Sequence, residues 1–233
     1  ESYRYYWRAT WRVAAPAWLG DENPEWKGNY PVRFWMKDWQ QVILRTTATR
    51  YDWLAEQILP WHKAYLDRII DAGFDGIYLD RIDVFSEHQS HHRRARADMI
   101  AFVSSIAAYA RSRRAGFLVV AQNAEELLTD RRYLSTIDAI AKEDLQFGAH
   151  KERTPNPVEE VREAMLNLDR ARTAGKPVLV VEYVDDTEQQ VLALVTARQK
   201  GYVPLIARRA LDQTPEPVLE LPPATAPALP PAR

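Results

Sequence analysis

The predicted fold starts from one stretch, Ala72-Gly73-Phe74-Asp75-Gly76-Ile77-Tyr78-Leu79-Asp80-Arg81-Ile82-Asp83. The glycine at position 73 predicts the end of a helix, because glycine readily adopts the left-handed backbone that caps a helix. A short apolar strand follows and ends at Asp80, with a second carboxylate at Asp83. Carboxylates at the carboxyl end of a buried parallel strand are where α/β enzymes keep their reactive groups. The stretch therefore predicts an α/β fold with chemistry at this strand end.

The same alternation of a short apolar run and an amphipathic helix continues along the chain. Strands are expected over 76–79, 117–121, 139–141, 178–181 and 203–206. Helices are expected over 93–113, 124–135, 158–174 and 187–200. Gly116, Gly175 and Gly201 each lie between a helix and a strand, where a helix-capping glycine belongs. This order predicts a parallel sheet with right-handed crossovers.

Five strands are fewer than the eight that close a (β/α)₈ barrel. Residues 1–38 look like an irregular loop rich in aromatic side chains, and residues 38–72 look helical with a break at Pro60. The sequence therefore predicts a TIM barrel over residues 1–212, truncated at its N-terminal side to about the last five strands. Residues 213–233 are rich in Pro and Ala and predict an extended, unpacked tail.

The composition limits the partners that can be expected. The 233 residues carry 31 basic and 32 acidic side chains, for a net charge of −1. Because the positive and negative side chains balance, the protein has no net positive potential that would attract a polyanion. Nucleic acid is therefore not an expected partner. No apolar run reaches about 18 residues, so no membrane span is expected. The chain contains no cysteine, which removes thiolate nucleophiles and disulfides. No cofactor is expected, and the oligomeric state is not predicted.

Polar side chains follow every expected strand, and in a barrel such strand ends face one mouth. In strand order they are Asp80 with Asp83, Gln122 with Asn123, Lys142-Glu143-Asp144, Glu182-Tyr183 with Asp185, and Arg208-Arg209. Carboxylates, amides and nearby aromatic rings suit a sugar, whose hydroxyls need many donors and acceptors. Glycoside cleavage needs one protonated carboxylic acid and one ionised carboxylate. A mouth with several carboxylates therefore points to glycoside chemistry.

Four segments, taken in order, resemble glycoside hydrolase family 114. They are Gly73-Phe74-Asp75-Gly76-Ile77-Tyr78-Leu79-Asp80, Gln122-Asn123-Ala124-Glu125-Glu126-Leu127-Leu128, Ile137-Asp138-Ala139-Ile140-Ala141-Lys142-Glu143-Asp144-Leu145 and Val178-Leu179-Val180-Val181-Glu182-Tyr183. The opening residues 1–7 and the turn 23–26 resemble the family's loop after its third strand. The resemblance covers roughly residues 1–212.

This resemblance implies a (β/α)₈ barrel whose named activity is endo-α-1,4-polygalactosaminidase. It implies that three strands lie upstream and that the catalytic acidic pair falls on Asp80 and Glu143. It also implies a glycosidase that acts on an amino-sugar polysaccharide or oligosaccharide and is extracellular or periplasmic. The resemblance implies that this fragment alone is inactive if the missing strands are needed. The sugar, the linkage and the stereochemical outcome stay open.

Each candidate residue also has a simpler explanation in the sequence. Asp80 could pair with Arg81, and Glu143 could pair with Lys142. Which of the two is the acid and which the nucleophile stays open, because the relative burial of the carboxyl groups decides it. The predicted substrate-binding residues are Asn123, Glu182, Tyr183, Asp83, Trp35 and Tyr6. Among them Asp83 is expected to support its neighbours, and Trp35 and Tyr6 are candidates for stacking on a sugar.

Two other functions fit the same pattern. Strand-end acids would serve a carbohydrate-binding barrel without turnover equally well. A metal-dependent hydrolase or deacetylase would use Asp80, Asp83 and the run His88-Gln89-Ser90-His91-His92. Neighbouring His91 and His92 cannot face one point on a helix, and arginines follow them at once, so no metal site is predicted.

Overall fold

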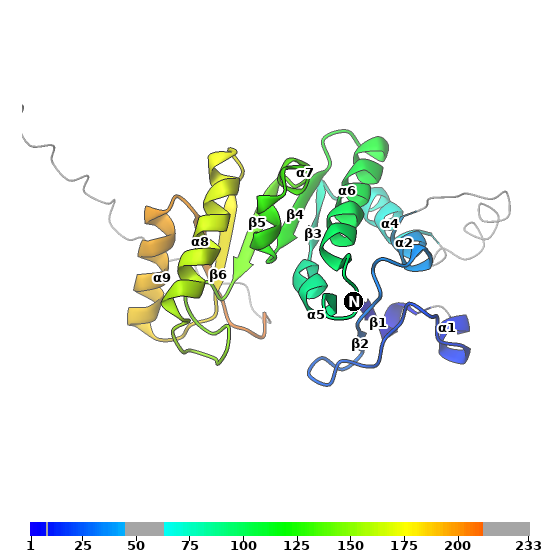
Figure 1. Ribbon diagram of the computed structural model, residues 1–233, viewed down its shortest axis with the longest axis horizontal. Coiled ribbons are helices and arrows are strands. Elements are labelled where there is room, and N and C mark those ends of the chain that lie inside the picture. The colour runs from blue at the N-terminus through cyan, green and yellow to red at the C-terminus, as the bar shows by residue number, and fades with distance from the viewer. Residues whose placement is uncertain (8, 45–62, 212–233) are drawn as a thin grey trace, which may run out of the picture.

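The computed structural model describes residues 1–7, 9–44 and 63–211. Its centre is a sheet of five parallel strands in the order β3-β4-β5-β6-β7 (Figure 1). The strands are β3 Gly76–Leu79, β4 Leu118–Gln122, β5 Ala139–Glu143, β6 Val178–Glu182 and β7 Val203–Ile206. Sequential strands are neighbours throughout, as in a barrel wall.

Helices connect each strand to the next. The 3₁₀ helix η3 Ile82–Val84, α5 Phe85–His88 and the long α6 Ala95–Arg113 follow β3. The connections after β4, β5 and β6 are η4 Glu125–Thr129 with α7 Arg131–Thr136, α8 Val158–Thr173, and α9 Thr187–Gln199. In the described part of the chain, no helix has the length and apolar character needed to cross a membrane.

The N-terminal region is irregular, with short elements. They are β1 Ser2–Tyr3, η1 Arg4–Tyr6, α1 Ala9–Val13, β2 Asn29–Tyr30, α2 Lys37–Ile43 and α4 Tyr65–Asp71. Strands β1 and β2 form a two-stranded antiparallel ribbon with Ser2 opposite Tyr30. Figure 1 shows this ribbon below the carboxyl end of β3, so β1 and β2 lie beside that strand end.

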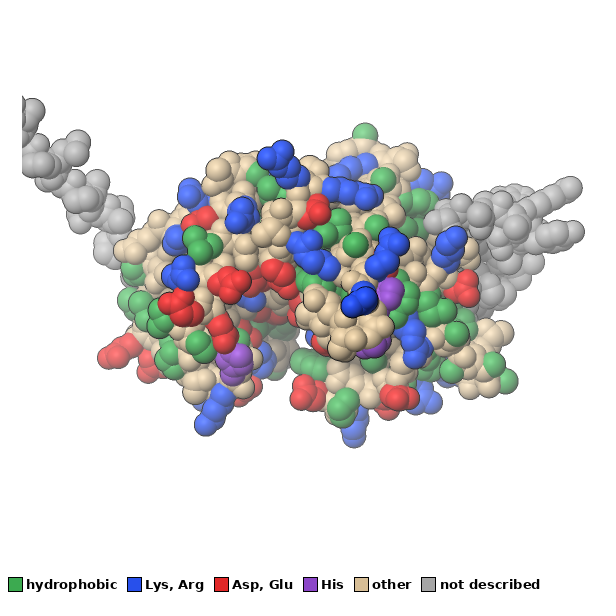
Figure 2. All heavy atoms as spheres, in the orientation of Figure 1, with side chains coloured by type: hydrophobic (Ala, Val, Ile, Leu, Met, Phe, Trp, Pro, Cys, Tyr) green, Lys and Arg blue, Asp and Glu red, His purple; other side chains and the backbone are tan. Residues whose placement is uncertain are grey.

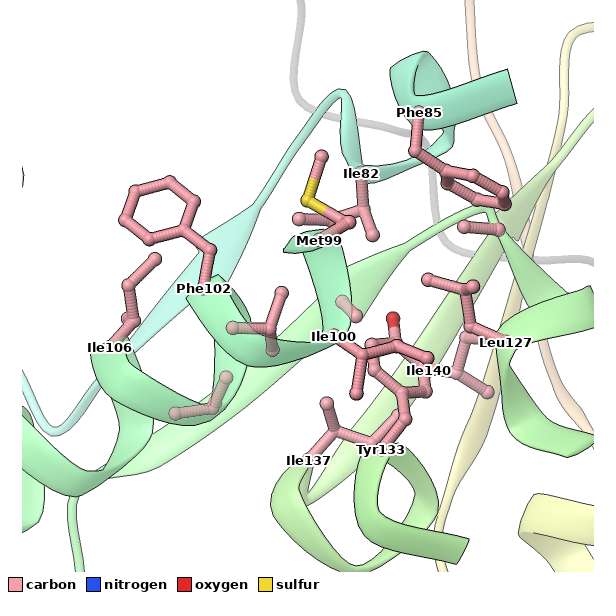
Figure 3. Packing of buried hydrophobic residues seen from close by; sticks show 14 of the residues in the cluster. Ile82, Phe85, Met99, Ile100, Phe102, Ile106, Leu127, Tyr133, Ile137 and Ile140 are labelled. Carbon is pink, nitrogen blue, oxygen red and sulfur yellow. The ribbon is translucent and has the colours of Figure 1, made fainter. Parts of the chain in front are cut away.

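The core lies between the sheet and its helices. Figure 3 shows Ile100 of α6 beside Tyr133 of α7 and Ile140 of β5, and Met99 of α6 beside Ile82. On the strands, Val119, Ala121, Ile140, Val178 and Val180 are at most 1% exposed and complete this layer. One face of every central strand is therefore held by helix packing.

Side chains alternate between the two faces of a strand, so the opposite face carries the residues in between. Tyr78, Leu118 and Val203 on this second face are about half exposed. Because every second residue lies on the same face, this second face also carries Asp80 after Tyr78, Gln122 after Val120, and Glu143 after Ala141. Polar groups thus lie at the carboxyl end of an apolar inner face, which is the arrangement of a barrel interior.

The predicted elements agree closely with the structure. The expected strands over 76–79 and 203–206 have the observed bounds, and the others differ by one or two residues. The helix expected over 124–135 is instead η4 and α7, because Asp130 accepts hydrogen bonds from the N–H groups of Arg132 and Tyr133 and starts a new helix. The break expected at Pro60 and the tail 213–233 lie outside the described residues.

Gly76 sets the spacing between β3 and β4. A Cβ atom at position 76 would lie 2.7 Å from both Cβ and the carbonyl oxygen of Leu118. Such contacts are far inside van der Waals separation, so any side chain would push the two strands apart. Because Asp80 follows β3 directly, this spacing also fixes where that carboxylate lies.

We expect Gly76→Ala to destabilise the fold by about 1–3 kcal/mol, because the backbone of β4 must move to accept the methyl group. Gly116→Ala is the control: Gly116 lies two residues before β4, and it has φ +76 and no atom near its missing Cβ. That control should cost only about 1 kcal/mol of backbone strain. Denaturant unfolding of both variants measures the difference, and an equal or smaller loss in Gly76→Ala would contradict this role of Gly76.

Candidate active site

A cleft of about 430 Å³ lies at the carboxyl ends of the parallel strands. One wall consists of strand-end residues, among them Asp80, Gln122, Glu143 and Tyr183. The other wall is the loop between β1 and β2, which contributes Trp26. Figure 2 shows acidic side chains beside a hollow in the lower middle of the molecule. The cleft therefore joins segments that are more than a hundred residues apart in sequence.

The amide group of Gln122 joins the two central carboxylates. Its Nε2 atom donates to Oδ1 of Asp80 at 3.1 Å and to Oε2 of Glu143 at 2.5 Å. Because both bonds share one nitrogen, the two oxygens can be no further apart than the sum of these lengths, 5.6 Å. Gln122 is 9% exposed, so its bonds compete little with water.

Glu143 accepts further hydrogen bonds. Asn123 Nδ2 lies 3.4 Å from Oε2, and the Tyr183 hydroxyl donates to Oε1. The backbone N–H of Glu143 donates to Oδ1 of Asn123 at 3.1 Å, which fixes the orientation of that amide. Three side-chain donors surround one carboxylate, and an ionised carboxylate is an acceptor of this kind.

The strand ends turn sharply through left-handed residues. Arg81 after β3, Asn123 after β4 and Asp144 after β5 have φ of 59°, 57° and 49°. Asparagine and aspartate tolerate this conformation, whereas arginine carries a strain of about 1–3 kcal/mol. Strained residues that cluster at the same end of neighbouring strands are typical of functional sites.

Arg81 and Asp83 form the side of the cleft below β3. Arg81 Nη2 donates to Glu87 Oε1 at 2.8 Å, and its Nε lies 3.6 Å from Glu1 Oε1. Burial raises the pKa of Asp83 above its ordinary value, although the charge of Arg81 acts in the opposite direction. The supporting role of Asp83 stays a prediction.

Two tyrosines keep their protons beside the carboxylates. Burial raises the pKa of Tyr78 to about 12, and the charges of Glu143 and Asp80 add to the effect. Burial also raises the pKa of Tyr183, followed by its hydrogen bond to Glu143. Both phenols therefore act as hydrogen-bond donors over the ordinary pH range.

Glu182 lies elsewhere than the sequence predicts. Its side chain is 1% exposed and faces the helices, where it accepts hydrogen bonds from the N–H groups of Gln146 at 2.7 Å and Phe147 at 3.3 Å. The strand continues to residue 182, so Glu182 and Tyr183 point to opposite faces. A buried carboxylate under a loop has no access to a substrate, so Glu182 is a structural acid.

One of the two aromatic candidates, Trp35, also needs correction. Trp35 stacks on His92 with ring centroids 4.3 Å apart and packs against the core, so it faces the histidines and not the cleft. The side chain of Tyr6 lies outside the described residues. Trp26, in the loop opposite the strand ends, is 60% exposed and lines the cleft. Asn23 Oδ1 accepts the backbone N–H of Trp26 at 3.4 Å and helps to fix that turn.

The histidine run makes contacts of its own away from the carboxylates. His88 Nδ1 lies 3.0 Å from His91 Nε2, and His92 Nε2 lies 2.7 Å from Asp98 Oδ2. Within residues 1–7, 9–44 and 63–211, no three His, Cys, Asp or Glu side chains are grouped to hold a metal ion. The structure therefore offers no support for chemistry that combines these histidines with Asp80 and Asp83.

The cleft unites five of the predicted residues, which are Asp80, Asp83, Asn123, Glu143 and Tyr183. It also contains residues that were not among the candidates, including Gln122, Arg81, Arg209 and Trp26. Gln122 and Arg209 follow the same strand-end rule and could have been included on that basis. Trp26 carries no such signal, because a loop residue is placed only by tertiary contacts.

The family model described as glycoside-hydrolase family GH114 matches residues 3–218. An uncharacterized protein of Deinococcus radiodurans is 37% identical over 213 residues, which cover 91% of this chain and 62% of that protein. Uncharacterized proteins of Methanocaldococcus jannaschii and Thermotoga maritima are 35% and 34% identical, each over 91% of this chain and over 60% and 63% of their own lengths. The chain thus spans about three fifths of these curated relatives.

Solved structures give the same fold. The glycoside hydrolase domain of PelA from Pseudomonas aeruginosa matches with a TM-score of 0.63 and 18% identity, over 89% of this chain and 75% of that one. A variant of that domain, with a glutamate replaced by alanine, matches with a TM-score of 0.61 and 16% identity. The expected α/β fold with the strand order of a partial barrel is confirmed, and the described strands form an open sheet.

We expect the buried Glu182 to make stability depend on pH. Burial raises its pKa from 4.5 to about 7. Between these values the unfolded chain is ionised while the folded protein keeps the proton, so stability falls as the pH rises from about 4.5 to above 7, by up to roughly 3 kcal/mol. Glu182→Gln mimics the protonated form and should lose this decrease.

Denaturant unfolding at pH values from about 4.5 to 8 measures the effect as a difference between variants. Glu163→Gln, at an exposed position on α8, is the control and should keep the pH dependence of the original protein. Equal pH dependence in Glu182→Gln and the original protein would show that the Glu182 carboxyl does not titrate in this range.

Proposed function

We propose that this chain, which belongs to glycoside-hydrolase family GH114, carries the catalytic carboxylate pair of an enzyme that hydrolyses an amino-sugar polysaccharide. The observation that carries the proposal is the Gln122 amide, which donates to Asp80 and Glu143 at once. Two neighbouring carboxyl groups at a cleft are the pair that most glycoside hydrolases use. Because the chain spans about three fifths of its relatives, the activity is proposed for the complete protein.

The separation of the two carboxylates favours retention of configuration. Asp80 Oδ1 and Glu143 Oε2 lie within 5.6 Å of each other. Retaining glycosidases have carboxyl groups about 5–5.5 Å apart, whereas inverting enzymes need roughly 6.5–9.5 Å to fit a water molecule beside the sugar. The short separation of these two nearest oxygens therefore favours the retaining arrangement.

In a retaining reaction the two carboxyl groups act in sequence. One gives its proton to the glycosidic oxygen as the bond to the leaving sugar breaks, and the other bonds to the anomeric carbon. The first group then takes a proton from water, whose oxygen displaces the carboxylate and releases the sugar. Gln122 and Tyr183 hold Glu143 in place, and Gln122 and the N–H of Arg81 hold Asp80.

The charge of the cleft favours binding of a positively charged sugar. Five acids line it, which are Glu1, Glu25, Asp80, Asp83 and Glu143, against the two arginines 81 and 209. Both arginines are already paired, with Glu87 and Asp144. The net field favours the protonated amine of an amino sugar over an acidic polysaccharide. The exposed Trp26 ring opposite the strand ends is the stacking surface that this proposal assigns to the sugar.

We expect Asp80→Asn and Glu143→Gln, each made in the complete protein, to lower kcat by at least about 100-fold on oligosaccharides of α-1,4-linked galactosamine. Each change keeps the shape and removes the charge or the proton that the reaction needs. Release of reducing ends measures the rate. Asp185→Asn, which alters an exposed acid after β6, is the control and should keep full activity.

Two results would count against this assignment. One is hydrolysis at the original rate by either variant. The other is binding of the polymer by the original protein without release of reducing ends, which would favour a carbohydrate-binding barrel. Azide rescue of Asp80→Ala and Glu143→Ala then assigns the roles, because azide gives the inverted product only when it replaces the nucleophile.

The anomer that appears first provides a separate prediction. An α-linked substrate should yield the α anomer first, because two displacements at one carbon restore its configuration. Proton NMR of the anomeric signals, recorded faster than mutarotation, measures this. Early appearance of the β anomer would mean that the carboxylates open beyond the distance fixed by Gln122.

A further inference from the structure

Arg209 reaches the cleft from the loop after β7. Its guanidinium lies over the Tyr183 ring, 4.6 Å from the centroid, and its Nη2 donates to Asp144 Oδ1 at 2.8 Å. Its Nε lies 3.5 Å from Glu152 Oε1. The hydroxyl of Tyr183 donates to Glu143. These contacts connect the loop after β5 (residues 144–157, called the β5 loop below) through Arg209 and Tyr183 to Glu143, the proposed catalytic carboxylate.

The β5 loop is shaped to hold this guanidinium. At Gly148 a Cβ atom would lie 2.9 Å from Oδ1 of Asp144 and 3.1 Å from Nη2 of Arg209. The backbone there has φ +88, which side-chain-bearing residues rarely adopt. Glycine at this position therefore lets the loop close tightly around the Asp144–Arg209 pair.

A planar cation is suited to this place. A guanidinium can lie flat on an aromatic ring and at the same time donate from its edge to carboxylates, whereas the ammonium of lysine is a point charge on a flexible stem. Asp144 and Glu152 compensate the charge of Arg209, so its contact with the ring acts mainly through geometry.

We propose that Arg209 is a positioning residue that clamps the Tyr183 ring so that its hydroxyl stays on Glu143. This inference rests on the proposed function, since it assumes that Glu143 is one of the catalytic carboxylates. Arg209 holds Tyr183, Tyr183 orients Glu143, and Asp144 anchors Arg209. The strands β5, β6 and β7 thereby control one carboxylate together.

The titration of Tyr183 tests the clamp without any activity. Burial raises the pKa of Tyr183 above 10.0, and the charged groups that face its phenol are Glu143, Asp144 and Arg209. Arg209→Lys keeps the positive charge, which by itself lowers the pKa of Tyr183, but releases the ring. We expect the Tyr183 pKa to fall toward 10 in this variant. NMR of ¹³Cζ-labelled tyrosine measures it, with Tyr183→Phe assigning the signal.

The control is Arg153→Lys, which alters an exposed arginine that pairs with Asp185 after β6. It should leave the Tyr183 titration unchanged. Gly148→Ala is a second test variant, because its methyl group would displace the Asp144–Arg209 pair. It should lower the Tyr183 pKa, as Arg209→Lys does. An unchanged titration in Arg209→Lys, or an equal fall in Arg153→Lys, would overturn the proposal.

Kinetics of the complete protein test the consequence for the reaction. We expect Arg209→Lys to lower kcat by roughly 10- to 100-fold with a much smaller change in KM, because Glu143 is misplaced. The double variant with Tyr183→Phe should lose no more than Tyr183→Phe alone, since both changes remove one interaction. Additive losses would overturn the clamp. If the original protein hydrolyses no glycan, the proposed function fails, while the tyrosine titration still decides the clamp.

Discussion

The site depends on one amide nitrogen that serves two carboxylates. For Gln122 Nε2 to reach both Asp80 and Glu143, strands β3, β4 and β5 must lie in one register, in which Leu79 pairs with Ala121 and Gln122 with Ala141. A slip by one residue would turn every side chain of a strand to the other face and separate the three groups. Helix packing on the outer face, and the missing side chain of Gly76, hold that register. The chemistry of the cleft is therefore a consequence of strand alignment.

A rigid sheet also allows strain at the strand ends. Arg81 adopts a left-handed backbone that costs about 1–3 kcal/mol, and it follows β3, which pairs with β4 along its whole length. The turns reverse the chain within one residue. They bring Asp80 beside Gln122 and leave Asp144 free to hold Arg209. Without the packed helices behind the sheet, these conformations would relax and the groups would separate.

The sequence predicted the strands well because each is a short apolar run bounded by glycine or by polar residues. It predicted that polar side chains gather at the strand ends, but not the direction of every side chain. The run Val178-Leu179-Val180-Val181 is apolar at each position, so no alternation shows whether Glu182 or Tyr183 faces the cleft. Trp35 and Trp26 were equally ambiguous, because both lie in irregular segments whose placement depends on contacts distant in sequence. The direction of these side chains is determined by contacts between residues distant in sequence, which a local sequence pattern does not reveal.

The two neighbouring residues that the sequence could not separate turn out to support the same site from opposite faces of β6. Tyr183 on the inner face donates to Glu143, while Glu182 on the outer face accepts the N–H groups of Gln146 and Phe147. Those two residues belong to the loop that begins at Asp144 and reaches Gly148, and this loop holds Arg209 against Tyr183. A buried carboxylate with no access to a substrate thus fixes the loop on which the Tyr183 contact depends. Strand β6 therefore controls the position of Glu143 in two ways. The Tyr183 hydroxyl acts on it directly, and Glu182 acts indirectly by fixing the loop after β5 that holds Arg209.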